Sequence, residues 1–169
     1  MTHPRSSNPF RFEGPLDPPA LIGRGVEVEA LIGFALDRRV VSLAAPRRYG
    51  KTSLLRAAGA VLQAEHDFLV AHVDLQAVSG IDDFVARFGS SWRSATRKHR
   101  PARRQFESVA GGLSSFGLTL LGTGVQFTRR HRDPQSALTA AHALLDLPAD
   151  AGAPVLVVMD EFQDLHGAW

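Results

Sequence analysis

The sequence predicts an α/β protein in which helices cover both faces of a mostly parallel sheet, a three-layer α/β/α arrangement. Two apolar runs carry this prediction. The first, residues 40–45, is followed by a Pro- and Gly-containing loop and then by a helix that begins at residues 50–52. The second, residues 154–159, ends in the carboxylates Asp160 and Glu161. Short apolar runs bounded by such breaks are typical of buried parallel strands.

The loop between the first strand and its helix has the pattern of a phosphate-binding loop, the Walker A motif of P-loop NTPases. Backbone N–H groups at a helix start and the helix dipole both favour a bound anion. Gly50 lets the backbone approach a phosphate, Lys51 reaches the β- and γ-phosphates, and the Thr52 hydroxyl serves Mg²⁺. Ala45 stands where the pattern has its first glycine, so it needs a compatible backbone angle. The predicted nucleotide-binding residues of the loop are Ala45, Pro46, Arg47, Arg48, Tyr49, Gly50, Lys51, Thr52 and Ser53.

The second apolar run and its two acids have the pattern of a Walker B strand. A buried parallel strand delivers side chains to the carboxyl edge of the sheet, where ligands bind in open α/β folds. We expect Asp160 to hold Mg²⁺ through water and Glu161 to orient the attacking water. The alternative is a buried strand that is simply capped by two solvated acids.

Three segments together resemble one family, the archaeal-type ATPases. These are AAA+-like P-loop ATPases close to the STAND signalling NTPases and to the origin-recognition initiators. The resemblance covers most of the chain, although residues 99–133 carry none of the family's motifs. The segments are Leu21-Ile22-Gly23-Arg24 with Glu27 and Glu29, then the loop Pro46–Leu55, then Asp160-Glu161-Phe162-Gln163, and the leader Asn8–Phe12 with Gly14-Pro15 is also similar.

This resemblance implies a fold of the AAA+/ASCE type, with ATP and Mg²⁺ as ligands and ADP and phosphate as products. It also implies that Ile22 and Gly23 pass beside the adenine, although a plain turn before a helix explains them equally well. The preference for ATP over GTP rests on the resemblance alone.

The family places a further sensor strand, an arginine finger and a helical lid after its Walker B strand, whereas this chain ends at Trp169. We therefore expect a C-terminally incomplete domain with two unpaired strand edges and negligible hydrolysis. Three functional alternatives stay open: a signalling switch that acts through effector domains or self-association, an ATPase that acts on nucleic acid, and a nucleotide-binding remnant that does not hydrolyse.

Length and composition limit the number of domains and the classes of protein that are possible. At 169 residues the chain is one domain or less, with residues 1–18 as an extended lead-in and residues 19–169 as the ATP-binding part. It has no cysteine, which excludes disulfides and thiolate metal sites. The sequence has neither a signal peptide nor an apolar stretch of about 20 residues, so we expect a cytoplasmic protein without a membrane partner.

The remaining elements follow from periodicity and turn signals. We expect an amphipathic helix over residues 26–38 and a strand over residues 68–75, where Asp74 caps the following turn rather than binding Mg²⁺. We expect His72 to be a half-buried strand residue rather than a ligand. A helix from about residue 79 becomes basic towards residues 93–104. That basic run has two interpretations. It is a binding surface for nucleic acid or another acidic partner, or it is a solvated helix end favoured by the helix dipole.

A basic and hairpin-containing insertion is expected at about residues 99–133. Alternating residues around a Gly-Thr-Gly turn predict a β-hairpin within residues 109–130. Asp133-Pro134-Gln135 then predicts the start of a helix that leads into the Walker B strand.

Overall fold

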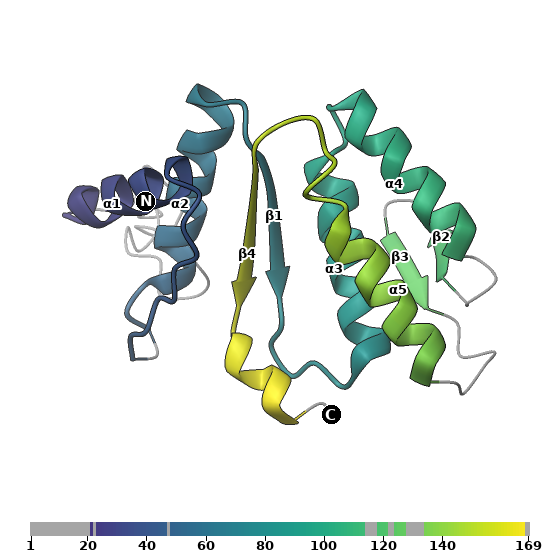
Figure 1. The fold of residues 1–169 in the computed structure, drawn as a ribbon. Helices are drawn as coiled ribbons and strands as arrows, with labels where there is room; N and C mark the ends of the chain where they lie inside the picture. The colour runs from purple at the N-terminus through teal and green to yellow at the C-terminus, as the bar shows by residue number, and fades with distance from the viewer. Residues whose placement is uncertain are drawn as a thin grey trace, which may run out of the picture. The chain divides into compact units, whose positions relative to one another are not determined.

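A computed structural model describes residues 21, 23–46, 48–113, 118–121, 124–127 and 134–167 (Figure 1). The chain divides into two compact units, residues 1–61 and residues 62–169. Helix α1 (Gly25–Leu36) lies in the first unit, and helix α2 (Lys51–Glu65) contains the boundary. Both helices were predicted, but none of the described α1 residues is buried, so the amphipathic burial expected there is not seen.

The second unit has an α/β architecture. Its parallel sheet pairs β1 (Leu69–Asp74) with β4 (Val155–Asp160), and Asp74 lies opposite Asp160 in the register. This parallel pairing of the strand after the loop helix with the strand that ends in the two acids confirms the α/β class. The other elements are α3 (Ile81–Ala95), α4 (Arg100–Gly112), β2 (Leu118–Leu121), β3 (Gly124–Phe127), α5 (Pro134–Asp146) and the 3₁₀ helix η3 (Phe162–Gly167).

One face of the β1–β4 sheet carries the core. Successive strand residues point to opposite faces, so alternate residues share a face. Figure 1 shows α3 and α5 on the same side of this sheet. Apolar residues of α3 repeat at helical spacing and meet the strand residues of this face. Members of the cluster that are at most 1% exposed are Ala71, Val73, Leu75, Val85, Phe88, Trp92, Ala102, Phe106, Ala140, Leu144 and Leu147.

The predicted strand at residues 40–45 is wrong. These residues form neither helix nor strand, Val40 is fully exposed, and Val41 is 42% exposed. A strand is held by ladder hydrogen bonds to a neighbour, and neither strand of the described parallel sheet pairs with this segment. The apolar run therefore lacks the partner that would make it a strand.

The basic run is not the end of one long helix, as the sequence suggested. The chain turns at residues 96–99, and α4 starts at Arg100 with Pro101 in its first turn. Proline is tolerated there because the first N–H groups of a helix have no intrahelical partner. Helix α4 also continues to Gly112, into the region predicted to leave the helical pattern. Beyond it, β2 and β3 pair antiparallel with Leu121 opposite Gly124, which confirms the hairpin.

Candidate phosphate-binding loop and Walker B strand

The loop before α2 turns sharply and delivers Lys51 to the first position of a 15-residue helix. Arg48 and Gly50 have positive φ angles of 66° and 77°. Leu54 N–H donates to the Gly50 carbonyl at 2.9 Å, which closes the first helical turn. Ala45 does not have a positive φ, so alanine is compatible with the position where the motif has glycine.

Lys51 reaches back over the loop that precedes it. Its ammonium donates to the carbonyl oxygen of Ala45 at 2.7 Å and to that of Pro46 at 3.3 Å. The Lys51 side chain thus folds back onto two carbonyls that precede its own helix. A phosphate oxygen carries more negative charge than a carbonyl oxygen and would compete for the same ammonium.

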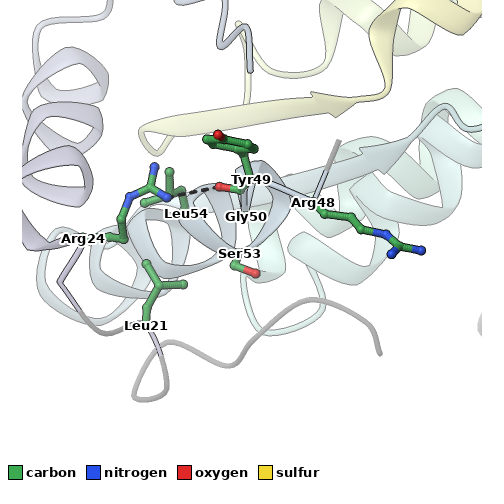
Figure 2. Close-up of a pocket in the computed structure, with 7 residues that line it drawn as sticks. All are labelled: Leu21, Arg24, Arg48, Tyr49, Gly50, Ser53 and Leu54. Atoms are coloured by element: carbon green, nitrogen blue, oxygen red, sulfur yellow. Dashed lines mark hydrogen bonds between the residues drawn. The ribbon is translucent and has the colours of Figure 1, made fainter. Parts of the chain in front are cut away.

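A pocket of about 380 Å³ adjoins the start of α2 (Figure 2). This volume lies within the range of about 300–1,000 Å³ that is usual for small-molecule sites. The lining combines apolar side chains with two arginines, and Figure 2 shows the Arg48 side chain extending away from the other labelled residues. The lining residues are Leu21, Arg24, Arg48, Tyr49, Gly50, Ser53 and Leu54.

Arg24 ties the segment before α1 to this loop. Its guanidinium donates to the Tyr49 carbonyl at 3.1 Å, as the dashed line in Figure 2 marks, and its Nε donates to Glu27 at 2.6 Å. The pKa of Glu27 is lowered from its usual value, first by a hydrogen bond from its own backbone and then by Arg24. The Arg24 guanidinium at this pocket is thus already paired with a carboxylate and a backbone carbonyl.

The carboxyl end of β4 holds the two predicted Walker B acids in different environments. Asp160 is 7% exposed, and its Oδ1 accepts a hydrogen bond from the Glu161 N–H at 3.0 Å. Its other carboxylate oxygen lies 3.5 Å from Nε2 of His72 on β1. Glu161 has a positive φ of 53°, and its carboxylate accepts a hydrogen bond from the Gln163 side-chain amide.

The carboxyl end of β1 is closed by local hydrogen bonds. Asp74 Oδ1 accepts from the Gln76 N–H at 2.9 Å, which confirms that Asp74 caps the turn. Arg87 of α3 donates to the carbonyls of Asp74 and Gln76, both at 2.9 Å, and forms a two-point ion pair with Asp83. The pKa of Asp83 is lowered, first by its hydrogen bonds from Arg87.

The structure therefore brings the loop residues together in the first unit and Asp160 and Glu161 together in the second. Gly23 has a positive φ of 75°, as a turn requires. Ile22 and Arg47 lie outside the described residues. Sequence reasoning gave no role to Leu54, which lines the pocket one helical turn after Gly50, or to the contact between His72 and Asp160. Helical spacing from Gly50 could have indicated the position of Leu54, whereas the contact between His72 and Asp160 depends on the register of the two strands.

Comparison with models of protein families, with curated proteins and with solved structures finds no match to this chain. Within the described residues, no group of three or more His, Cys, Asp or Glu side chains is arranged to hold a metal ion. No helix in that part of the chain is long and apolar enough to cross a membrane.

Proposed function

We propose that this chain binds a nucleoside triphosphate with Mg²⁺ through the loop at the start of α2, as an AAA+-like P-loop ATPase of the three-layer α/β/α type. The observation that carries the proposal is the position of Lys51, which opens α2 directly after the left-handed Gly50. Its ammonium already lies over the carbonyls of Ala45 and Pro46. ATP rather than GTP follows from the family resemblance.

Each loop residue has a distinct task in this proposal. The backbone N–H groups at the start of α2 donate to phosphate oxygens, aided by the helix dipole. Lys51 exchanges its carbonyl partners for phosphate oxygens, and the Thr52 hydroxyl donates an oxygen ligand to Mg²⁺. Arg24 places a guanidinium at the pocket, and Leu21 offers apolar surface to a base.

Asp160 at the end of β4 and Glu161 directly after it have the chemistry that hydrolysis requires. The Asp160 carboxylate is suited to the hydration shell of Mg²⁺, which neutralises charge on the transferring phosphoryl group. The Glu161 carboxylate is suited to accepting a proton from the attacking water. Its positive φ also supports a functional role, because left-handed backbone in a residue with a Cβ costs about 1–3 kcal/mol and clusters at functional sites.

Titration of the chain with ATP·Mg²⁺ by isothermal calorimetry tests the proposal. Lys51→Ala removes a cation that faces phosphate charge, a contact worth about 1.5–3 kcal/mol, so the affinity should fall more than about tenfold. Arg56→Ala is the matched control, because Arg56 is an exposed cation on the same helix. Tripolyphosphate should compete with ATP. Equal affinity of the Lys51 variant and the wild type, both folded by thermal melt, would remove the phosphate-loop assignment.

A non-hydrolysing nucleotide-binding protein is the second candidate. It is favoured by the hydrogen bond that engages the Glu161 carboxylate with Gln163, since a general base must be free to reach water. The two candidates share the binding step and differ only in turnover, which a Glu161 substitution separates.

A further inference from the structure

Positive charge is concentrated where α3 ends and α4 begins. Residues 93–107 contain six arginines and lysines but a single carboxylate, Glu107, which gives this stretch a charge of +5. The whole chain carries only +2, so all other residues together carry −3. No acidic residue occurs between Asp83 and Glu107. We call residues 93–104 the basic corner.

The backbone of the basic corner is fixed by internal hydrogen bonds. Thr96 is fully buried, and its hydroxyl donates to the Trp92 carbonyl at 2.9 Å. The His99 N–H donates to the Thr96 carbonyl at 2.9 Å, and His99 Nδ1 accepts from the Ala102 N–H at 3.3 Å, which caps α4. Helix α4 is anchored in the core by Ala102 and Phe106, which are fully buried. The charges therefore stand on a rigid support.

Four cations of the basic corner are exposed and have no carboxylate partner among the described residues: Arg97, Lys98, Arg100 and Arg104. Arg103 differs, because its Nε donates to Glu107 at 2.8 Å. Arg87, six residues before the corner, is likewise neutralised by Asp83. Unpaired cations repel one another, so this surface is stabilised by any polyanion that brings several negative charges at once.

We infer that the basic corner binds the phosphate backbone of double-stranded nucleic acid without reading its sequence. Three of the four cations are arginines, whose planar guanidinium matches phosphate geometry, and the N-terminus of α4 adds its dipole. A membrane surface is less suitable, because none of the exposed large apolar side chains of the described chain lies between residues 93 and 107. This inference does not depend on nucleotide binding at the α2 loop.

Fluorescence anisotropy with a labelled mixed-sequence DNA duplex of about 20 base pairs tests this inference, with the full chain and without nucleotide. Each phosphate contact contributes about −0.9 to the slope of log K against log salt, so four contacts predict a slope between about −3 and −4. The triple variant Arg97→Ala, Arg100→Ala, Arg104→Ala should bind at least about tenfold more weakly, with the slope reduced by about three. Duplexes of different sequence should bind alike.

Two control variants separate the basic corner from net charge and from folding. Arg38→Ala, Arg39→Ala, Arg56→Ala removes the same charge from three exposed arginines elsewhere and should leave most of the affinity and slope. Replacing Arg97, Arg100 and Arg104 by lysine keeps the charge and should retain backbone binding. Lys51→Ala should bind the duplex like the wild type, so failure of the nucleotide site and failure of the basic corner are distinguishable.

The same variants define the results that would overturn the inference. Equal loss of duplex binding in the two arginine-to-alanine triples would show that only net charge matters. Wild-type chain that binds anionic lipid vesicles or polyglutamate more tightly than the duplex at equal salt would assign the surface to a different class of partner. Absence of duplex binding at about 50 mM salt, where backbone contacts are strongest, would also reject it.

Discussion

The Asp164 carboxylate accepts a hydrogen bond from the Ala77 N–H at 2.7 Å, and so joins the segments that follow the two strands of the parallel sheet. Asp164 lies on η3, directly after β4, and Ala77 lies in the turn after β1 with a positive φ of 51°. The Leu75 N–H also donates to the Asp160 carbonyl, at 3.0 Å. These hydrogen bonds hold together the carboxyl ends of β1 and β4, where the predicted Walker B acids lie.

Asp164→Ala should destabilise the chain by about 1 kcal/mol, because the exposed Ala77 N–H loses a charged acceptor. Asp164→Asn keeps an acceptor oxygen and should recover most of that loss. Urea unfolding measures both values, and Asp146→Ala, which removes an exposed carboxylate from α5, is the control. A loss no larger than that of the control would show that the contact adds nothing to stability.

Local sequence signals predicted much of this fold. The Gly50-Lys51-Thr52 sequence located the start of α2, and the short side chain of Asp74 indicated a cap that the structure contains. Phe84, Val85 and Phe88 lie at helical spacing in the sequence, and all three are buried on α3. In each case the cause lies within a few residues, so the sequence contains it directly.

Strand pairing and side-chain contacts between residues far apart in the sequence could not be predicted. Residues 40–45 have the composition of a buried strand, yet composition does not name a partner, and the ladder is absent there. His72 approaches Asp160 only because β1 and β4 pair in one particular register. The break at residues 96–99 is different, because Pro101 was visible in the sequence and marks a helix start more often than a helix interior.

Phe88 should be a strong determinant of stability. It is 1% exposed, lies in the cluster between α3 and the sheet, and has its ring 5.9 Å from that of Phe84. Phe88→Ala should lower the free energy of unfolding by about 3–5 kcal/mol, through lost burial and a cavity. Phe162→Ala is matched in chemistry, but Phe162 is 58% exposed and should cost under about 0.5 kcal/mol. Similar losses for the two variants would contradict the placement of the core.

The ion pair of Asp83 with Arg87 should make stability depend on pH in acid. The pKa of Asp83 is lowered below its usual value of 3.8, so the folded state favours the ionised carboxylate. Its contribution is therefore complete above about pH 4 and is lost as the pH falls through the lowered pKa. Asp83→Asn should destabilise by about 1 kcal/mol at pH 7, since the pair is partly exposed.

The test for Asp83 is a series of urea unfolding curves of wild type and Asp83→Asn between about pH 7 and pH 2. The difference between the two proteins should be constant down to about pH 4 and shrink below it. Asp150→Asn, which changes an exposed carboxylate, should show no such convergence. A difference that stays constant to pH 2 would mean that the ionised carboxylate of Asp83 is not what Arg87 stabilises.

Glu161→Gln should separate nucleotide binding from hydrolysis. Glutamine has nearly the same shape as glutamate and can still accept a hydrogen bond from Gln163, but it cannot take a proton from water. In the proposed function Lys51, Thr52 and Asp160 hold the nucleotide and Mg²⁺, so the affinity for ATP·Mg²⁺ by calorimetry should change less than about threefold. Loss of a general base typically costs about 10²–10⁴ in rate, so any phosphate release by the wild type should fall by at least about a hundredfold. Gln163→Ala releases the Glu161 carboxylate and should preserve or raise turnover.

If wild-type chain binds ATP·Mg²⁺ and releases phosphate no faster than Glu161→Gln, the chain is a nucleotide-binding protein without hydrolysis. If both proteins turn over at the same substantial rate, another group activates the water.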